Sequence, residues 1–350
     1  MSPELLVAGL GIVALVAYAV FGGADFGGGV WDFFASGPRK QQQRDAIAHA
    51  MGPVWEANHV WLIFVIVIIF SGFPAAYSAL SIALFVPFHL VLLGIILRGA
   101  AFVFRAYSPQ SARGVGARAT GSATRRWGAI FGAASVITPV LFGMCLGAVS
   151  SGAIRVSDAG VVSEAAWLTP VSLLIGALAL SLCAYLAAVF LANETDGPLR
   201  EDFRRRALFA GTAVVALSAI ALPLVKWQAP HLWDGLVGGA AMPLLVPGIA
   251  AALLSGWWLN ARQYRLARIS SIVQVACLLA GWALAQSPYI IYPDVTLGSA
   301  AAPRSTLLFI LWSTPAGMAL LLPSLWLLFR VFKAEHIGHT ASSASPDATS

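Results

Sequence analysis

Charged side chains are scarce in this sequence. Only 10% of its 350 residues are Asp, Glu, Lys or Arg, whereas a soluble domain carries roughly 25%. Hydrophobic residues make up 59% of the chain, and the mean hydropathy is +0.81. A water-soluble fold of this length could not bury so much apolar surface, so the composition excludes a soluble globular protein. We expect an integral membrane protein that crosses the bilayer.

Cysteine and histidine are also too few and too scattered for most metal or redox chemistry. The three cysteines, Cys145, Cys183 and Cys277, each stand alone in an apolar stretch, which excludes a CxxC pair and predicts plain packing. The six histidines form no HExxH motif, so no metal site is predicted. His89 lies within an apolar stretch and is a weak candidate haem ligand, with a satisfied buried histidine as the commoner alternative. No catalytic residue is predicted in this chain.

Long apolar stretches account for most of the sequence. We predict about nine transmembrane helices, over residues 5–24, 53–72, 76–104, 128–150, 165–192, 207–225, 236–258, 267–287 and 305–330. Each is long enough for the ~20 residues that a helix needs to cross ~30 Å of hydrocarbon. The expected fold is an all-α polytopic membrane protein with a single integral membrane domain over residues 1–335. The Ser-rich residues 336–350 are expected to form a disordered cytoplasmic tail.

Basic residues mark one side of the membrane. Most Lys and Arg residues lie in every second loop and in the tail, at 37–52, 105–127, 193–206, 259–268 and after 329. The positive-inside rule therefore predicts a periplasmic N-terminus and a cytoplasmic C-terminus in a bacterial inner membrane. The net charge of +6 is spread over these short loops, so it does not indicate a nucleic-acid surface. No basic residue precedes the first apolar stretch, so we expect the first helix to be retained.

Four ionisable side chains fall at one depth near the predicted cytoplasmic side. Asp25 lies about 30 Å along the first helix, and Arg98 reaches the same depth near the inner end of the third. Glu56 lies in the first turn of the second helix, with His59 on the same face three residues later. Because such groups are costly in a bilayer, all four are candidates for a proton path. A structural ion-pair network is the alternative, and spacing alone leaves both open.

Two further features accompany these residues. Asn58 and Trp61 follow Glu56 on the second helix and are candidates for lining a channel, with plain packing as the alternative. The glycine-rich stretch 22–29 has no preceding strand, which argues against a dinucleotide fingerprint. Small residues at this density instead predict close approach between neighbouring helices.

Three motifs carry a resemblance to a known family. They are GGADFGGGVWD at 22–32, GPVWEANHVWLI at 52–63 and LRGAAF at 97–102, with a weaker match, SPYIIYP, at 287–293. These segments resemble subunit II of cytochrome bd-type quinol oxidases, a group that includes a cyanide-insensitive branch. The strong motifs cover about the first third of the chain, and the span count and orientation agree over the rest.

The resemblance implies a partner, a fold and a role. The partner is a subunit I that carries haems b and d, or b only, together with the quinol site, and a small single-helix subunit can join them. The complex oxidises quinol, reduces dioxygen to water and draws protons from the cytoplasm, while subunit II supplies no haem ligand. The implied fold is two four-helix bundles, about 1–150 and 165–287, plus a last helix at 305–330. Asp25 and Glu56 match acidic residues of the family's proton pathway.

Two departures and two rival functions remain. Many relatives have a Glu where this chain has Val103, and Asp294 stands where a smaller or neutral residue is expected. One rival is a proton-coupled secondary transporter that uses Asp25 and Glu56, and the other is a purely structural assembly subunit. The titratable groups gather in the first three helices with no counterpart in the later half, which disfavours the transporter.

Overall fold

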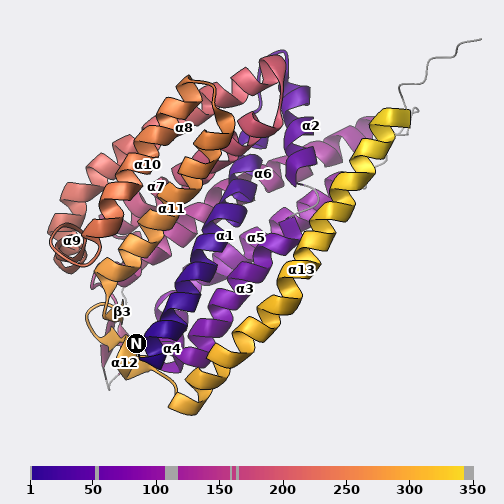
Figure 1. Cartoon of the computed structure of the whole chain (residues 1–350). Coiled ribbons are helices and arrows are strands. Elements are labelled where there is room, and N and C mark those ends of the chain that lie inside the picture. Colours follow the sequence, from indigo (N-terminus) through magenta and orange to yellow (C-terminus); the bar gives the residue numbers. More distant parts are fainter. Residues whose placement is uncertain (1, 52–54, 107–116, 158–159, 163–164, 343–350) are drawn as a thin grey trace, which may run out of the picture.

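The computed structural model describes residues 2–51, 55–106, 117–157, 160–162 and 165–342. These residues form a bundle of long helices with two short antiparallel β-hairpins (Figure 1). Within them, eight helices are long and apolar enough to cross a membrane, or up to nine if one bent pair counts as a single span. The prediction of an all-α polytopic membrane protein is confirmed.

The elements follow one another with short connections. The helices are α1 (Pro3–Phe33), α2 (Lys40–Met51), α3 (Trp55–Gly72), α4 (Pro74–Ala83), α5 (Phe85–Ala106), α6 (Ala117–Ser150), α7 (Pro170–Glu194), α8 (Gly197–Gln228), α9 (Pro230–Val237), α10 (Met242–Asn260), α11 (Tyr264–Gln286), α12 (Leu297–Ala300) and α13 (Arg304–Ser342), with a 3₁₀ turn at Ala166–Leu168. The strands are β1 (Arg155–Ser157), β2 (Gly160–Val162), β3 (Tyr289–Ile291) and β4 (Val295–Thr296). Several helices begin with proline at the first or second position, where its missing N–H costs nothing.

The single helix predicted over 76–104 is wrong. The chain forms α4, ends it at Ala83, and begins α5 at Phe85. Helix α4 is bent by 117° from the preceding residues 58–72 of α3. A continuous helix over 76–104 would be about 44 Å long, well beyond the ~30 Å hydrocarbon core. Helix α5 alone, with 22 residues and a length of about 33 Å, is sufficient to cross it.

Other predicted boundaries also shift. The seventh helix begins at Met242 rather than 236, because the residues before it form the separate short helix α9. The loop at 37–52 contains α2, a helix too polar to be identified from apolar stretches. Helix α13 continues to Ser342, past 330 and into the tail that was expected to be disordered. The rest of that tail, 343–350, lies outside the described residues.

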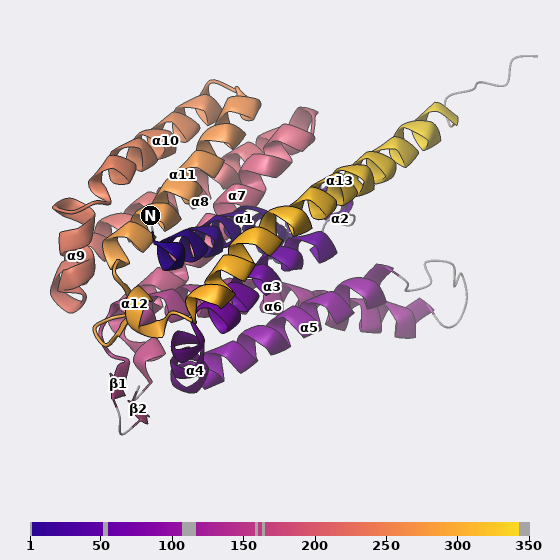
Figure 2. The ribbon, with the colours of Figure 1, turned by 60° about the horizontal axis from the view of Figure 1, so that its bottom comes forward.

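Different elements lie at the two ends of the bundle (Figure 1). At the hairpin end lie the start of α1, both β-hairpins and α12 (Figure 2). At the opposite end, which we call the basic end, lie α2 and the beginning of α8. The basic end carries Arg39, Arg44, Arg200, Arg204 and Arg206.

Helix α1 packs against α3, α6 and α7 along its length. Its glycine-rich stretch permits this close approach. A Cβ added at Gly27 would overlap the backbone carbonyl oxygen of Cys183 on α7, and one at Gly29 would overlap the Ser135 side chain on α6. The expected role of these small residues in helix packing is therefore confirmed. Helix α13 lies along the side of the bundle against α1 and α3 (Figure 2).

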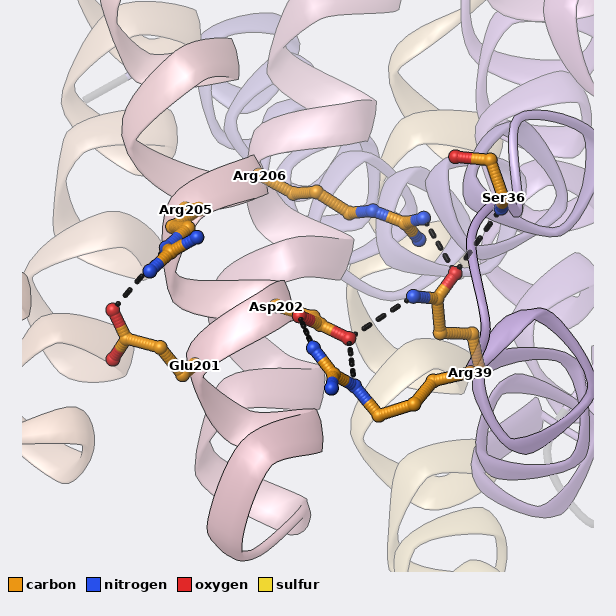
Figure 3. A network of polar contacts seen from close by, with 7 residues as sticks. Ser36, Arg39, Glu201, Asp202, Arg205 and Arg206 are labelled. Atoms are coloured by element: carbon orange, nitrogen blue, oxygen red, sulfur yellow. Dashed lines mark hydrogen bonds and ion pairs between the residues drawn. The ribbon is translucent and has the colours of Figure 1, made fainter.

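A polar clamp joins α2 to α8 at the basic end (Figure 3). The Arg39 guanidinium donates to both carboxylate oxygens of Asp202, with Nε–Oδ2 and Nη2–Oδ1 distances of 2.8 and 2.5 Å. Gln43 on α2 donates to the same carboxylate at 3.1 Å and accepts from Arg206 at 2.6 Å. These contacts tie the first fifty residues to a helix more than 150 residues later.

The three cysteines are free thiols. Cys145 is buried and Cys183 and Cys277 are half-buried, in agreement with the predicted packing role.

Candidate functional site: a buried ion pair between three helices

Asp25 and Arg98 form an ion pair inside the bundle. Helix α1 supplies Asp25 and α5 supplies Arg98, and the Nη1–Oδ2 distance is 2.6 Å. Nη2 of Arg98 also donates to the backbone carbonyl of Asp25 at 2.9 Å. Both side chains are only 3% exposed. A buried pair of this kind is stable only when its remaining polar atoms find partners, so the surroundings of each atom matter.

Helix α6 completes the coordination of the arginine. Nε of Arg98 donates to the Ser135 hydroxyl at 3.1 Å, and Ser135 in turn donates to the Phe131 carbonyl of its own helix at 2.7 Å. The guanidinium carbon lies 4.9 Å from the centre of the Phe26 ring and 5.0 Å from that of Phe131, close enough for cation–π attraction. Arg98 is thus fixed by three helices and two aromatic rings.

The carboxylate of Asp25 is satisfied on one side only. Oδ2 accepts from Arg98, whereas Oδ1 is buried and has no hydrogen-bond partner within the described residues. A buried acceptor without a partner is unusual and costs free energy unless water or a proton satisfies it. The two oxygens of the Asp25 carboxylate therefore have different surroundings.

Asn58 and His59 on α3 contact α1 one and two turns before Asp25. Asn58 is buried and donates to the Phe21 carbonyl of α1 at 3.4 Å. His59 is half-buried, and its ring meets the edge of the Tyr18 ring with centroids 6.3 Å apart. Trp61 is half-buried on the same helix, and a channel-lining role for it and for Asn58 stays a prediction. The Glu56 side chain lies outside the described residues, so its predicted position is not tested.

His89 is not the buried histidine that was expected as the alternative to a haem ligand. It is exposed on α5, its Nδ1 lies 2.7 Å from the Phe85 carbonyl one turn earlier, and its ring rests against the Phe85 ring. The apolar residues around His89 in the sequence form an exposed helix surface rather than the bundle interior. Within the described residues, no group of three His, Cys, Asp or Glu side chains could hold a metal ion.

Three residues of the site were not identified from the sequence: Ser135, Thr138 and Tyr18. All three side chains are buried. The available signal was the pair of hydroxyl residues, Ser135 and Thr138, three positions apart in an otherwise apolar stretch. That spacing places both on one helix face.

Comparisons with known proteins identify the family and the fold. Residues 3–332 match the family described as "Cytochrome bd terminal oxidase subunit II". The chain belongs to this family. The resemblance carried by the motifs around Asp25, Glu56 and Arg98 is therefore confirmed, and the chain is a multi-pass membrane subunit of a respiratory oxidase.

Relatives with curated names agree with the family assignment. A candidate cytochrome bd menaquinol oxidase subunit II of Bacillus subtilis is 23% identical over 90% of this chain and 91% of its own length. Cytochrome bd ubiquinol oxidase subunit 2 of the same organism is 28% identical over 60% of this chain and 59% of its own length. Cytochrome bd-I ubiquinol oxidase subunit 2 of Escherichia coli is 27% identical over 60% of this chain and 53% of its own length.

A solved structure shares the fold. A chain in the structure of bd oxidase from Geobacillus thermodenitrificans superposes with a TM-score of 0.78 over 95% of this chain and 99% of that chain, at 22% identity. The fold of that chain is therefore shared by nearly the whole of this one.

Proposed function

We propose that this chain is the non-haem subunit II of a bd-type terminal quinol:oxygen oxidoreductase and contributes a proton-uptake path from the cytoplasm. The partner is a subunit I that holds haems b and d, or b only, and oxidises quinol while reducing dioxygen to water. Family membership and the quinol oxidase names of the relatives support this assembly. The two-bundle arrangement, a small single-helix subunit and bound lipid belong to the same proposal.

The orientation of the chain in the membrane is inferred from the distribution of its basic residues. The basic end carries α2 and the arginines of α8, so the positive-inside rule places it on the cytoplasmic side of a bacterial inner membrane. Asp25 lies eight residues before the end of α1 at that side, a rise of about 12 Å. A proton that enters at the basic end therefore has a short distance to travel to the carboxylate.

The proposal is supported chiefly by the difference in hydrogen bonding between the two carboxylate oxygens of Asp25. Arg98 donates to Oδ2, while Oδ1 is buried and has no hydrogen-bond partner among the described residues. A carboxylate bound on both oxygens would be a purely structural partner for arginine. One with a free lone pair inside a membrane can accept a proton from water and pass it on. Glu56 and His59, on the facing helix, are the proposed neighbours on this route.

The test is Asp25→Asn in the assembled oxidase. The amide keeps the shape of the side chain, and Arg98 keeps its bonds to the Asp25 carbonyl and to Ser135. We expect an intact haem spectrum and a turnover reduced by about tenfold or more, since a lost proton-transfer group typically costs a factor of about 10² to 10⁴. Oxygen consumption per haem measures this.

Asp202→Asn is the matched control. It removes a carboxylate from another arginine pair, the clamp at the basic end, and should leave turnover unchanged. Full turnover of the Asp25→Asn complex, with its normal haem spectrum, would favour the purely structural subunit instead.

The transporter alternative is disfavoured by the distribution of buried charge. Within the described residues, the buried Asp, Glu, Lys and Arg side chains are Asp25, Asp32 and Arg98, all before residue 100. A transporter built from two similar halves would be expected to have a counterpart in the second half.

A further inference from the structure

Among the residues that the structure describes, three polar atoms on α1 and α6 are buried without a hydrogen-bond partner. They are Oδ1 of Asp25, the hydroxyl of Tyr18 and Oγ1 of Thr138. These residues are 4%, 6% and 0% exposed, respectively. Nearly all buried polar atoms in proteins are paired with protein or with ordered water. Three unpaired atoms in one region therefore indicate a site that water occupies.

Tyr18 lies on the same face of α1 as Asp25, two turns earlier. Its ring lies along the helix toward Asp25, because Gly22 between them has no side chain. A Cβ at Gly22 would stand 2.8 Å from Cε2 of the ring. Asp25 and Arg98 are close enough to act electrostatically on the phenol. Gly22 thus permits a conformation that brings the Tyr18 hydroxyl toward the ion pair.

Thr138 reaches the same level from α6. It lies one turn from Ser135, the hydroxyl that binds Arg98. Its Oγ1 lies directly over Gly94 of α5, where a Cβ would overlap it, and Gly94 is one turn before Arg98. The ring of Phe142, one turn beyond Thr138, packs edge-to-face with the Tyr18 ring, and their centroids are 5.7 Å apart. Phe142 therefore links the Tyr18 ring to the part of α6 that carries Thr138, on the hairpin-end side of the ion pair.

A backbone carbonyl adds to this polar surface. Pro139 lies inside α6 and has no N–H to donate, so the helix bond to the carbonyl of Ser135 is missing. Backbone groups freed in this way inside a membrane protein are satisfied by hydroxyl side chains or by ordered water.

We propose that Asp25, Tyr18 and Thr138 enclose a buried water site that continues the proton path beyond the Asp25–Arg98 pair. Water bound to Oδ1 of Asp25 also binds the Tyr18 hydroxyl, and Tyr18 positions it. The Tyr18 ring contacts His59, so the same tyrosine joins the water site to the second candidate group on α3. This inference rests on the proposed proton-uptake role for its functional part, but the water site itself does not.

The first experiment measures the water directly. A structure of the whole oxidase at a resolution that shows ordered solvent should contain density within hydrogen-bond distance of Asp25 Oδ1 and the Tyr18 hydroxyl. The density should weaken in Tyr18→Phe, which retains the ring, and in Thr138→Val, which retains the shape. A dry site in the wild-type complex would overturn the proposal.

The second experiment measures proton transfer through the proposed water site. Tyr18→Phe should lower oxygen consumption per haem by about tenfold. This is the effect expected when one hydrogen bond worth about 1.4 kcal/mol is lost from the rate-limiting proton transfer. The variant should also raise the solvent deuterium isotope effect. Tyr185→Phe is the control, because it removes a buried hydroxyl that donates to Ser255 in the other half of the bundle. Gly22→Ala, which displaces the Tyr18 ring, should reproduce the Tyr18→Phe phenotype.

The outcomes separate the two proposals. If Asp25→Asn is slow while Tyr18→Phe turns over normally, the route through Tyr18 is overturned and the uptake role of Asp25 stands. If Asp25→Asn turns over normally while the density is present, the proposed uptake role fails and the water site is supported.

Discussion

At the scale of single residues, the two charged groups of the site differ in how many of their polar atoms have hydrogen-bond partners. Each nitrogen of the Arg98 guanidinium has an acceptor, on Asp25 or on Ser135. In Asp25, Oδ2 is paired and Oδ1 has no partner within the part of the chain that the structure describes. The arginine is therefore held on all three of its nitrogens, whereas the carboxylate is held on one oxygen.

Removing Arg98 alone should therefore destabilise the protein more than removing both charges of the pair. Arg98→Met leaves the Asp25 carboxylate buried without a counter-charge, which should cost about 3 kcal/mol or more of stability. The double variant Asp25→Asn/Arg98→Met should recover part of this loss, because no isolated charge remains. The apparent thermal midpoint of the purified complex measures both. A double variant no more stable than Arg98→Met would contradict a dominant role for the buried charge.

Asp294, a departure from the expected outer turn, has a structural partner. Arg155 donates to both oxygens of Asp294 at 2.8 and 3.0 Å, and the Val156 N–H donates at 2.8 Å. The pair joins the β1–β2 hairpin to the turn after β3. The Arg155 guanidinium holds the pKa of Asp294 below its usual value, with help from the Val156 N–H.

A pH dependence follows from this shift. The folded pKa lies below the unfolded value of about 3.9, so the ionised carboxylate stabilises the hairpins above that pH, and the contribution is lost as pH falls through the folded pKa. Acidification below about pH 4 should therefore loosen residues 288–297, as measured by hydrogen exchange relative to Asp294→Asn at the same pH. Asp196→Asn, an exposed carboxylate at the other end, is the control. Equal acid response of wild type and Asp294→Asn would contradict this role.

At the scale of helices, glycine sets the distance between α1 and α7. Gly27→Ala would drive a methyl group into the Cys183 carbonyl and the side chain of Ala187. Because neither backbone can yield without separating the helices, we expect a loss of about 1–3 kcal/mol. Gly9→Ala, on the same helix with nothing within 4 Å of the new Cβ, is the matched control and should be neutral or slightly stabilising. The yield and thermal midpoint of the complex distinguish the two, and equal behaviour would contradict close packing at Gly27.

At the scale of the whole molecule, the proposed complex predicts what purifies together. A tagged chain isolated in mild detergent from native membranes should bring a second large membrane subunit and show b- and d-type, or all b-type, haem bands in a reduced-minus-oxidised spectrum. The chain expressed without that partner should be colourless. A colourless single chain from native membranes would contradict the oxidase assembly and direct attention to transport assays.

The polar clamp between α8 and the start of α2 also concerns the whole molecule. Arg39, Gln43 and Asp202 connect elements that are adjacent only after the helices have packed (Figure 3). Their residue types are ordinary for a polar loop between membrane helices, so nothing in the pattern identified them as partners. The same is true of Ser135 and Thr138, whose hydroxyls acquire a role only from what α1 and α5 bring to them.

The sequence by itself determined the solvent, the long helices and the family. A stretch of about 20 apolar residues must cross a bilayer as a helix, because no other open structure satisfies its backbone there. The motifs around Asp25 and Arg98 predicted the family and, together with helix depth, that these two residues lie at one level. Contiguous apolar residues could not show where 76–104 breaks or that His89 faces outward, because both depend on neighbouring helices. Only the tertiary structure decided which oxygen of Asp25 is paired and which is open, since hydrogen bonds between helices depend on their relative rotation and distance.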